Sequence, residues 1–111
     1  MQKNKFKHNL KLKVRKMKIS ELKAGMSNVS LQAKVIDKSE ARIVQTRYGK
    51  RSVADAVIED DSGEIKVSLW QDQIKRVNVG DRVSISGAFV TMFRDGLQLN
   101  IPKSGKIEVV K

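Results

Sequence analysis

The sequence predicts an all-β fold, a small closed barrel of five strands, and two observations support this prediction. From Met17 onward, the seven glycines of the chain separate short runs that are rich in valine and isoleucine, which is typical of antiparallel strands joined by turns. Within several runs, apolar and polar residues alternate, as in a strand with one buried face. The expected strands are Val29–Lys38, Arg51–Glu59, Glu64–Trp70, Arg82–Met92 and Leu97–Ile101, with Lys106–Val110 as a candidate last strand.

The connections between these strands differ in length and narrow the choice of barrel. Asp60–Gly63 has the composition of a tight hairpin turn, and Asp95–Gly96 is a second turn. We expect the link Ser39–Lys50 to be a long loop. The link Gln71–Asp81 holds at most a short helix, near Asp72–Arg76. A helix or loop between the third and fourth of five strands is the arrangement of the OB-fold.

Length and charge predict one basic domain. The chain has 111 residues, enough for a single modest core. Its formal net charge is +11, and residues 1–16 carry seven lysines and arginines and no acidic residue. Charge repulsion favours a disordered N-terminal arm there over a frayed strand. We therefore expect an OB-fold domain at residues 17–111, with a surface that attracts a polyanion such as nucleic acid or anionic lipid.

The residue types of common catalytic and metal sites are missing. The chain has no cysteine and a single histidine, His8, in the basic arm. This excludes thiolate zinc sites and Ser/His/Asp chemistry, so we expect no enzyme, no cofactor and no metal. Asp60 and Asp61 have an alternative interpretation as a metal or catalytic pair, but a turn explains them better. No apolar run approaches the roughly 20 residues that cross a bilayer, and we expect a cytoplasmic, nucleoid-associated protein.

The third strand indicates which face carries function. Alternation places Ile65, Val67 and Leu69 on one face, and it places Lys66, Ser68 and Trp70 on the other. The sole tryptophan therefore lies with the polar residues. The alternative is that Trp70 folds back over the rim as a core plug.

The fourth strand presents further aromatic rings if it contains a bulge. A one-residue bulge at Gly87 switches the parity of the strand, because a long strand must bend to close a small barrel. Without the bulge, Phe89 belongs to the core. With it, Ala88, Val90 and Met92 point inward, and Phe89, Thr91 and Phe93 point outward. In the fifth strand, Leu97, Leu99 and Ile101 are expected inside, with Gln98 and Asn100 outside.

The outer face then combines aromatic rings with polar and basic groups. Exposed rings at Trp70, Phe89 and Phe93 indicate a flat apolar ligand, and nucleobases fit because every base offers a π-face. The long loop adds cations that can hold phosphates, although each one alone is more often a solvated loop charge. The expected polar and phosphate-binding set is Arg42, Gln45, Arg47, Arg51, Lys66, Thr91, Gln98 and Asn100.

From Lys18 to about Asn100, the chain resembles the small single-OB single-stranded-DNA-binding proteins of archaea, which are relatives of replication protein A. The resemblance rests on several short motifs of this sequence: Ser39-Glu40-Ala41-Arg42, Gln45-Thr46, Gly49, Arg51, Asp60-Asp61-Ser62-Gly63, Val67-Ser68-Leu69-Trp70, Ala88-Phe89-Val90-Thr91-Met92-Phe93 and Gln98-Leu99-Asn100. It implies that Trp70, Phe89 and Phe93 stack on bases, that Arg42 is the loop arginine, and that Val44 is an apolar loop contact.

Together these observations predict a non-enzymatic, monomeric protein that binds single-stranded DNA largely regardless of sequence. Stacking supplies affinity, and the basic groove attracts phosphates in a salt-dependent way. The expected role is in replication, repair or recombination, whose proteins are candidate partners; we expect no partner-recruiting tail after the last strand. Two alternatives stay open: an RNA-binding OB module, and a subunit whose aromatic face binds another protein.

Overall fold

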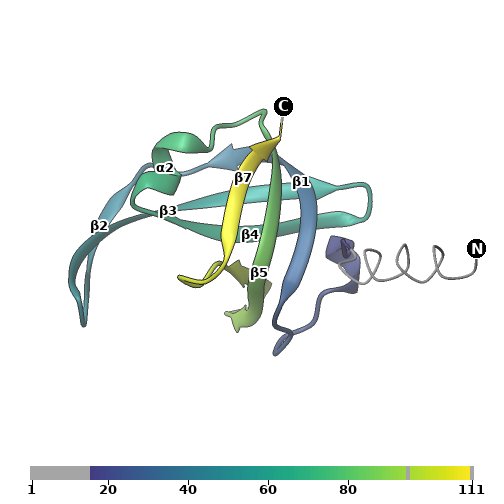
Figure 1. Cartoon of the computed structure of the whole chain (residues 1–111), viewed down its shortest axis with the longest axis horizontal. Helices are drawn as coiled ribbons and strands as arrows, with labels where there is room; N and C mark the ends of the chain where they lie inside the picture. Colours follow the sequence, from purple (N-terminus) through teal and green to yellow (C-terminus); the bar gives the residue numbers. More distant parts are fainter. Residues whose placement is uncertain (1–15, 95, 111) are drawn as a thin grey trace, which may run out of the picture.

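The computed structural model describes residues 16–94 and 96–110 and contains two short helices and seven strands (Figure 1). Within this part of the chain, no helix is long and apolar enough to span a membrane. The elements are η1 Ile19–Glu21, β1 Val29–Lys38, β2 Arg42–Thr46, β3 Gly49–Asp60, β4 Gly63–Trp70, α2 Asp72–Arg76, β5 Arg82–Phe93, β6 Gly96–Asn100 and β7 Lys106–Val110.

Five strands form a closed hydrogen-bonded circuit. The order is β1-β3-β4-β6-β5, and β5 pairs back with β1. All these pairings are antiparallel except β4 with β6, which run parallel. The remaining strands are attached at the sides, β2 to β3 and β7 to β5. The all-β prediction is thus confirmed, and the sheet has two strands more than the five of the predicted circuit.

The expectation of a long loop at Ser39–Lys50 is wrong, because most of this segment forms a two-stranded arm. β2 pairs with the first half of β3, from Arg42 opposite Val53 to Thr46 opposite Gly49. The Thr46 hydroxyl donates to the Gly49 carbonyl oxygen at 2.7 Å and closes the hairpin. Figure 1 shows this β2–β3 arm projecting from the side of the sheet.

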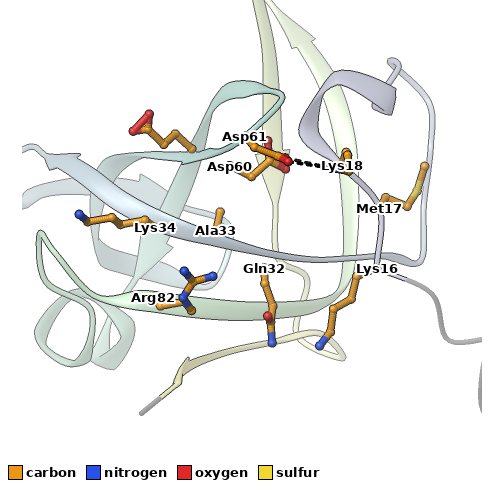
Figure 2. A pocket seen from close by; sticks show the side chains of 10 residues that line it. Lys16, Met17, Lys18, Gln32, Ala33, Lys34, Asp60, Asp61 and Arg82 are labelled. Carbon is orange, nitrogen blue, oxygen red and sulfur yellow. Dashed lines mark hydrogen bonds and ion pairs between the residues drawn. The ribbon is translucent and has the colours of Figure 1, made fainter.

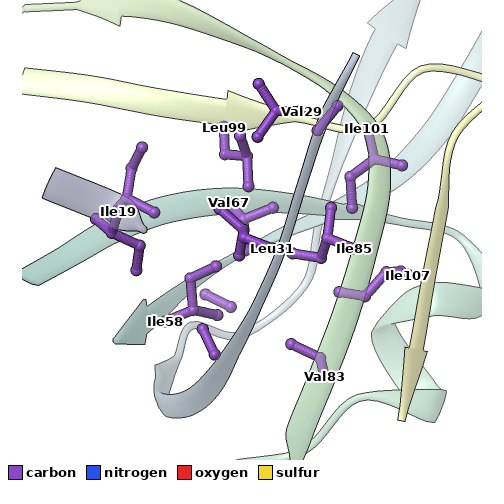
Figure 3. Packing of buried hydrophobic residues seen from close by; sticks show 14 of the residues in the cluster. Ile19, Val29, Leu31, Ile58, Val67, Val83, Ile85, Leu99, Ile101 and Ile107 are labelled. Atoms are coloured by element: carbon purple, nitrogen blue, oxygen red, sulfur yellow. The ribbon is translucent and has the colours of Figure 1, made fainter. Parts of the chain in front are cut away.

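The apolar core lies inside the circuit and uses the alternation expected from the sequence (Figure 3). Ile65, Val67 and Leu69 are buried, as are Val90 and Leu99. All five follow the strand pattern, so one face of β4, β5 and β6 packs inward while the other is free to carry a site. The inward residues labelled in Figure 3 come from β1, β3, β4, β5, β6 and β7 together with η1 and the start of the β6–β7 link.

Met92 was expected in the core, and this expectation is wrong: its side chain is 61% exposed. β5 pairs with β1 only as far as Ala88, and β4 pairs with β6 only at Gln98 and Leu99. Beyond that point the β5–β6 hairpin extends past the closed circuit. Leu97, which lies opposite Met92, still packs against the edge of the core, whereas Met92 is exposed to solvent.

The bulge predicted at Gly87 is confirmed. Val29 pairs with Ala88 while Leu31 pairs with Ile85, so β5 has one residue more than β1 over this interval. Gly87 adopts a φ of +70°, a conformation that glycine accepts at little cost. The bulge therefore turns the second half of β5 so that its aromatic residues point away from the core.

The β3–β4 turn anchors the segment before β1. Asp60 accepts hydrogen bonds from the backbone N–H of Ile19 at 2.9 Å and of Ser62 at 2.7 Å, and Lys18 pairs with Asp61 at 2.9 Å (Figure 2). Partial burial raises the pKa of Asp60, but hydrogen bonds from the Ser62 hydroxyl and from three backbone N–H groups outweigh it, so the pKa lies below its ordinary value. These contacts support the turn interpretation of the two aspartates.

Candidate nucleic-acid interface

A cavity of about 280 Å³ opens on the outer face of β4, β5 and β6, at the base of the β2–β3 arm. We call it the groove. Five strands contribute side chains to it, and these combine two aromatic rings with hydroxyl, amide and charged groups. The groove is lined by Arg42, Val44, Val53, Asp55, Lys66, Ser68, Trp70, Thr91, Phe93, Gln98 and Asn100.

Trp70 lies at one end of the groove, half-buried and outside the apolar core. As the last residue of β4 it pairs with Val53 of β3. Its backbone N–H donates to the Gln73 side-chain oxygen at 2.9 Å, which ties the end of the strand to α2. The chain leaves this position through Gln71 at a φ of +53°. The indole is therefore held by fixed backbone on both sides while remaining accessible from the groove.

Two phenyl rings lie on the same outer face of β5. Phe93 is 50% exposed and lines the groove, and Phe89, at 37% exposed, lies opposite Asn100 of β6. The guanidinium carbon of Arg94 lies 5.4 Å from the centre of the Phe93 ring, within the range of a cation–π contact. One face of this ring is thus in contact with a cation.

Amides and hydroxyls form a hydrogen-bonded floor between these rings. The Gln98 side-chain amide donates to the hydroxyl of Ser68, which is buried, and to the side-chain oxygen of Asn100. Asn100 in turn donates to the Thr91 hydroxyl at 3.0 Å and to the Gln98 carbonyl oxygen at 3.3 Å. The floor therefore spans β4, β6 and β5, and its amide N–H groups are engaged within the protein.

An ion pair lies where the arm meets the groove. Nη1 of Arg42 lies 3.4 Å from Oδ2 of Asp55. The backbone of Asp55 is fixed by Ser39, whose hydroxyl accepts from the Asp55 N–H at 2.9 Å and whose N–H donates to the Asp55 carbonyl oxygen at 2.7 Å. Together with Lys66, these groups give the groove two cations and one carboxylate.

Eight of the twelve residues predicted for the site line the groove; the other four do not. Phe89 lies on the groove's face but beyond its lining. Arg51 lies opposite Val44 on the arm and is exposed. Gln45 is on the other face of β2, where its amide donates to the Thr46 carbonyl oxygen, and Arg47 lies in the turn of the arm.

The predicted set lacked Val53, Asp55 and Ser68, which line the groove, and Arg94, which contacts Phe93. The first two were detectable, because the tight β3–β4 turn fixes the pairing register and places Val53 opposite Trp70 and Asp55 opposite Ser68. Arg94 was not, because its contact with Phe93 depends on a φ of +58° in the β5–β6 turn.

A larger cavity, of about 550 Å³, lies where residues 16–18 cross β1 near the β3–β4 turn (Figure 2). Its charges are nearly balanced, since Lys16, Lys18, Lys34 and Arg82 face Glu59, Asp60 and Asp61. It contains no aromatic ring. In the described part of the chain, no group of three acidic or histidine side chains is placed to hold a metal ion.

Comparison with known proteins identifies the family. Residues 1–109 match the family described as single-stranded DNA binding protein Ssb-like, OB fold. This chain belongs to that family. The resemblance stated from the sequence motifs is thereby confirmed.

Two curated proteins are similar in sequence to this chain over most of its length. The single-stranded DNA binding protein Ssb of Saccharolobus solfataricus is 34% identical over 90 residues, covering 81% of this chain and 61% of that protein. Replication factor A of Methanothermobacter thermautotrophicus is 36% identical over 98 residues, 82% of this chain but 12% of that protein. The chain thus spans less than two thirds of either relative.

Among solved structures, the OB domain of Ta0387 from Thermoplasma acidophilum superimposes with a TM-score of 0.74 at 28% identity, covering 85% of each chain. The predicted OB-fold is therefore confirmed for this Ssb-like chain, with a seven-stranded sheet and little helix.

Proposed function

We propose that this protein binds single-stranded DNA and catalyses no reaction. The observation that carries the proposal is the groove itself, in which the rings of Trp70 and Phe93 flank a polar floor with cations at the rim. Bases stack on such rings at about 1–3 kcal/mol each, largely regardless of sequence. The names of the relatives, a single-stranded DNA binding protein and a replication factor, support the same ligand.

In this proposal, each group of the groove has a separate task. Trp70, Phe93 and Phe89 are the stacking platforms, and the five strands of the circuit act as the closed barrel that holds them in place. Arg42 and Lys66 attract phosphates, with Arg47 and Arg51 extending that attraction along the arm. The protein acts as a monomer in replication, repair or recombination, where the proteins of those processes are its partners.

Tryptophan fluorescence tests the proposal directly, because Trp70 is the only tryptophan of the chain. We expect a short oligothymidylate to quench the emission in a saturable titration. Binding should weaken with salt, with a log–log slope of about −0.7 per phosphate neutralised. Matched RNA and DNA oligonucleotides in competition separate DNA binding from the RNA alternative.

Substitutions separate stacking from general charge attraction. Trp70→Ala is expected to cost about 1–3 kcal/mol of binding in an anisotropy titration, and Trp70→Phe much less, because a ring remains. Lys66→Ala should reduce both affinity and salt slope. Lys106→Ala, which removes the same charge from β7, is the control. Equal affinity of Trp70→Ala and the unaltered protein would contradict the proposal.

A further inference from the structure

Asp55 is the one carboxylate in a groove proposed to hold a polyanion, and this placement needs an explanation. Repulsion from phosphates makes a carboxylate costly there. Its side chain is 29% exposed and lines the groove beside Ser68, its partner across the β3–β4 pair. We propose that Asp55 reads the edge of a base and gives one position of the groove a preference for cytosine over thymine. This inference rests on the proposed function.

Asp55 lies close to the indole on which a base would stack. Val53 lies opposite Trp70, and Asp55 lies two residues further along β3 on the same face. Diagonal neighbours of this kind in an antiparallel pair are about 7–8 Å apart. A base stacked on the indole therefore has its edge within hydrogen-bonding reach of the carboxylate.

Most amide N–H groups of the groove are engaged within the protein, and this limits what a base can meet there. Both N–H groups of the Gln98 side-chain amide and both of Asn100 donate within the protein. Among the described residues, the only hydrogen bond to the Asp55 carboxylate comes from Arg42, at Oδ2. The groove thus offers two acceptors, Oδ1 of Asp55 and the side-chain oxygen of Gln98. Beside them lie the hydroxyls of Ser68 and Thr91, which can donate or accept.

Base chemistry converts these acceptors into a preference. Cytosine carries an N4 amino group, which donates to Asp or Glu in the usual pairing. At the same place thymine presents its O4 acceptor, with the single N3–H donor beside it. A carboxylate that faces position 4 is therefore bonded by cytosine and repelled by thymine. Stacking on Trp70 stays tolerant of sequence, and Asp55 adds discrimination at that one position.

The backbone of Asp55 is fixed by a neighbouring segment of the chain. Two hydrogen bonds with Ser39, one donated by the Asp55 N–H and one accepted by the Asp55 carbonyl oxygen, hold the Asp55 backbone without help from Arg42. Asp55→Asn should therefore leave the fold intact. Asparagine has the same shape and can both donate and accept, which suits either pyrimidine.

The test compares oligodeoxycytidylate with oligothymidylate of equal length, above neutral pH, by fluorescence anisotropy. We expect the unaltered protein to bind the cytosine strand about fivefold more tightly or better, and Asp55→Asn to bring this ratio close to one. Glu108→Gln removes the same charge from β7, outside the groove, and should keep the ratio unchanged.

Three outcomes would overturn the inference. Equal affinities of the unaltered protein for the two strands would show that no base is read. A ratio unchanged in Asp55→Asn, with both affinities lowered by one factor, would show that Asp55 acts only by positioning Arg42. Absence of binding to either strand would instead contradict the proposed function, and the inference with it.

Discussion

Replacing Gly87 with alanine tests the bulge that directs the aromatic residues of β5 outward. Gly87 has a φ of +70°, and an added Cβ would lie 3.1 Å from the Cα of Gly105. Gly105 is itself confined, since a Cβ there would lie 2.9 Å from the carbonyl oxygen of Ser86. A left-handed alanine costs about 1–2 kcal/mol and overpacking against fixed backbone about 1–3, so we expect Gly87→Ala to lower the free energy of unfolding by about 2–5 kcal/mol.

Gly25→Ala is the matched control. Gly25 also has a positive φ, +95°, but no heavy atom lies within 4 Å of an added Cβ. It therefore shares the backbone strain without the steric contact. Urea denaturation followed by Trp70 fluorescence measures both variants. An equal loss of stability in the two would show that the approach of Gly87 and Gly105 contributes nothing, and would refute the reasoning.

Three further predictions concern stability. Lys38→Met removes the ammonium group that donates to the carbonyl oxygens of Ile74 and Val77 at the end of α2. It should lower the free energy of unfolding, measured in thermal melts, by about 1–3 kcal/mol. Met92→Ser should change stability by less than about 0.5 kcal/mol in the same melts, since Met92 is exposed. Folding lowers the pKa of Asp60, so the ionised carboxylate contributes to the free energy of unfolding. This contribution is complete above the ordinary pKa of 3.8 and is lost as the pH falls through the folded pKa. In an acid titration, the stability of the unaltered protein should therefore converge on that of Asp60→Asn.

Alternation and turn chemistry were enough to predict most of the fold. The bounds of β1, α2 and β7 are those expected from the sequence. Alternating apolar residues mark β1, Gly105 comes directly before β7, and α2 is a short segment in the link between two strands. β2 was missed because its residues carry no buried face: Ile43 is 65% exposed and Arg42 is exposed. A strand that is stabilised only by pairing with its hairpin partner need not show alternating apolar and polar residues, so the sequence pattern does not reveal it.

The sequence predicted those groove residues whose outward orientation follows from alternation along a strand, such as Lys66, Trp70 and Thr91. Contacts that depend on pairing across strands were not predicted, and Asp55 is the clearest case. The predictions for residues 1–15 lie outside the described residues. Lys16, at the end of the predicted basic arm, lies beside the charge-balanced cavity and not in the groove.

β5 pairs with three strands, β1, β6 and β7, and this has a consequence for amide hydrogen exchange. Between Arg82 and Ser86 the strand is bonded along both edges, to β1 and to β7. The amides of this first half should therefore exchange among the slowest in the protein. The outer face of the second half carries Phe89, Thr91 and Phe93. That half of β5 pairs with β6, and its other edge is bonded at Val90, to Gly25 and Met26. It should therefore open more readily than the first half, and a ligand laid across it would order the protein as well as itself.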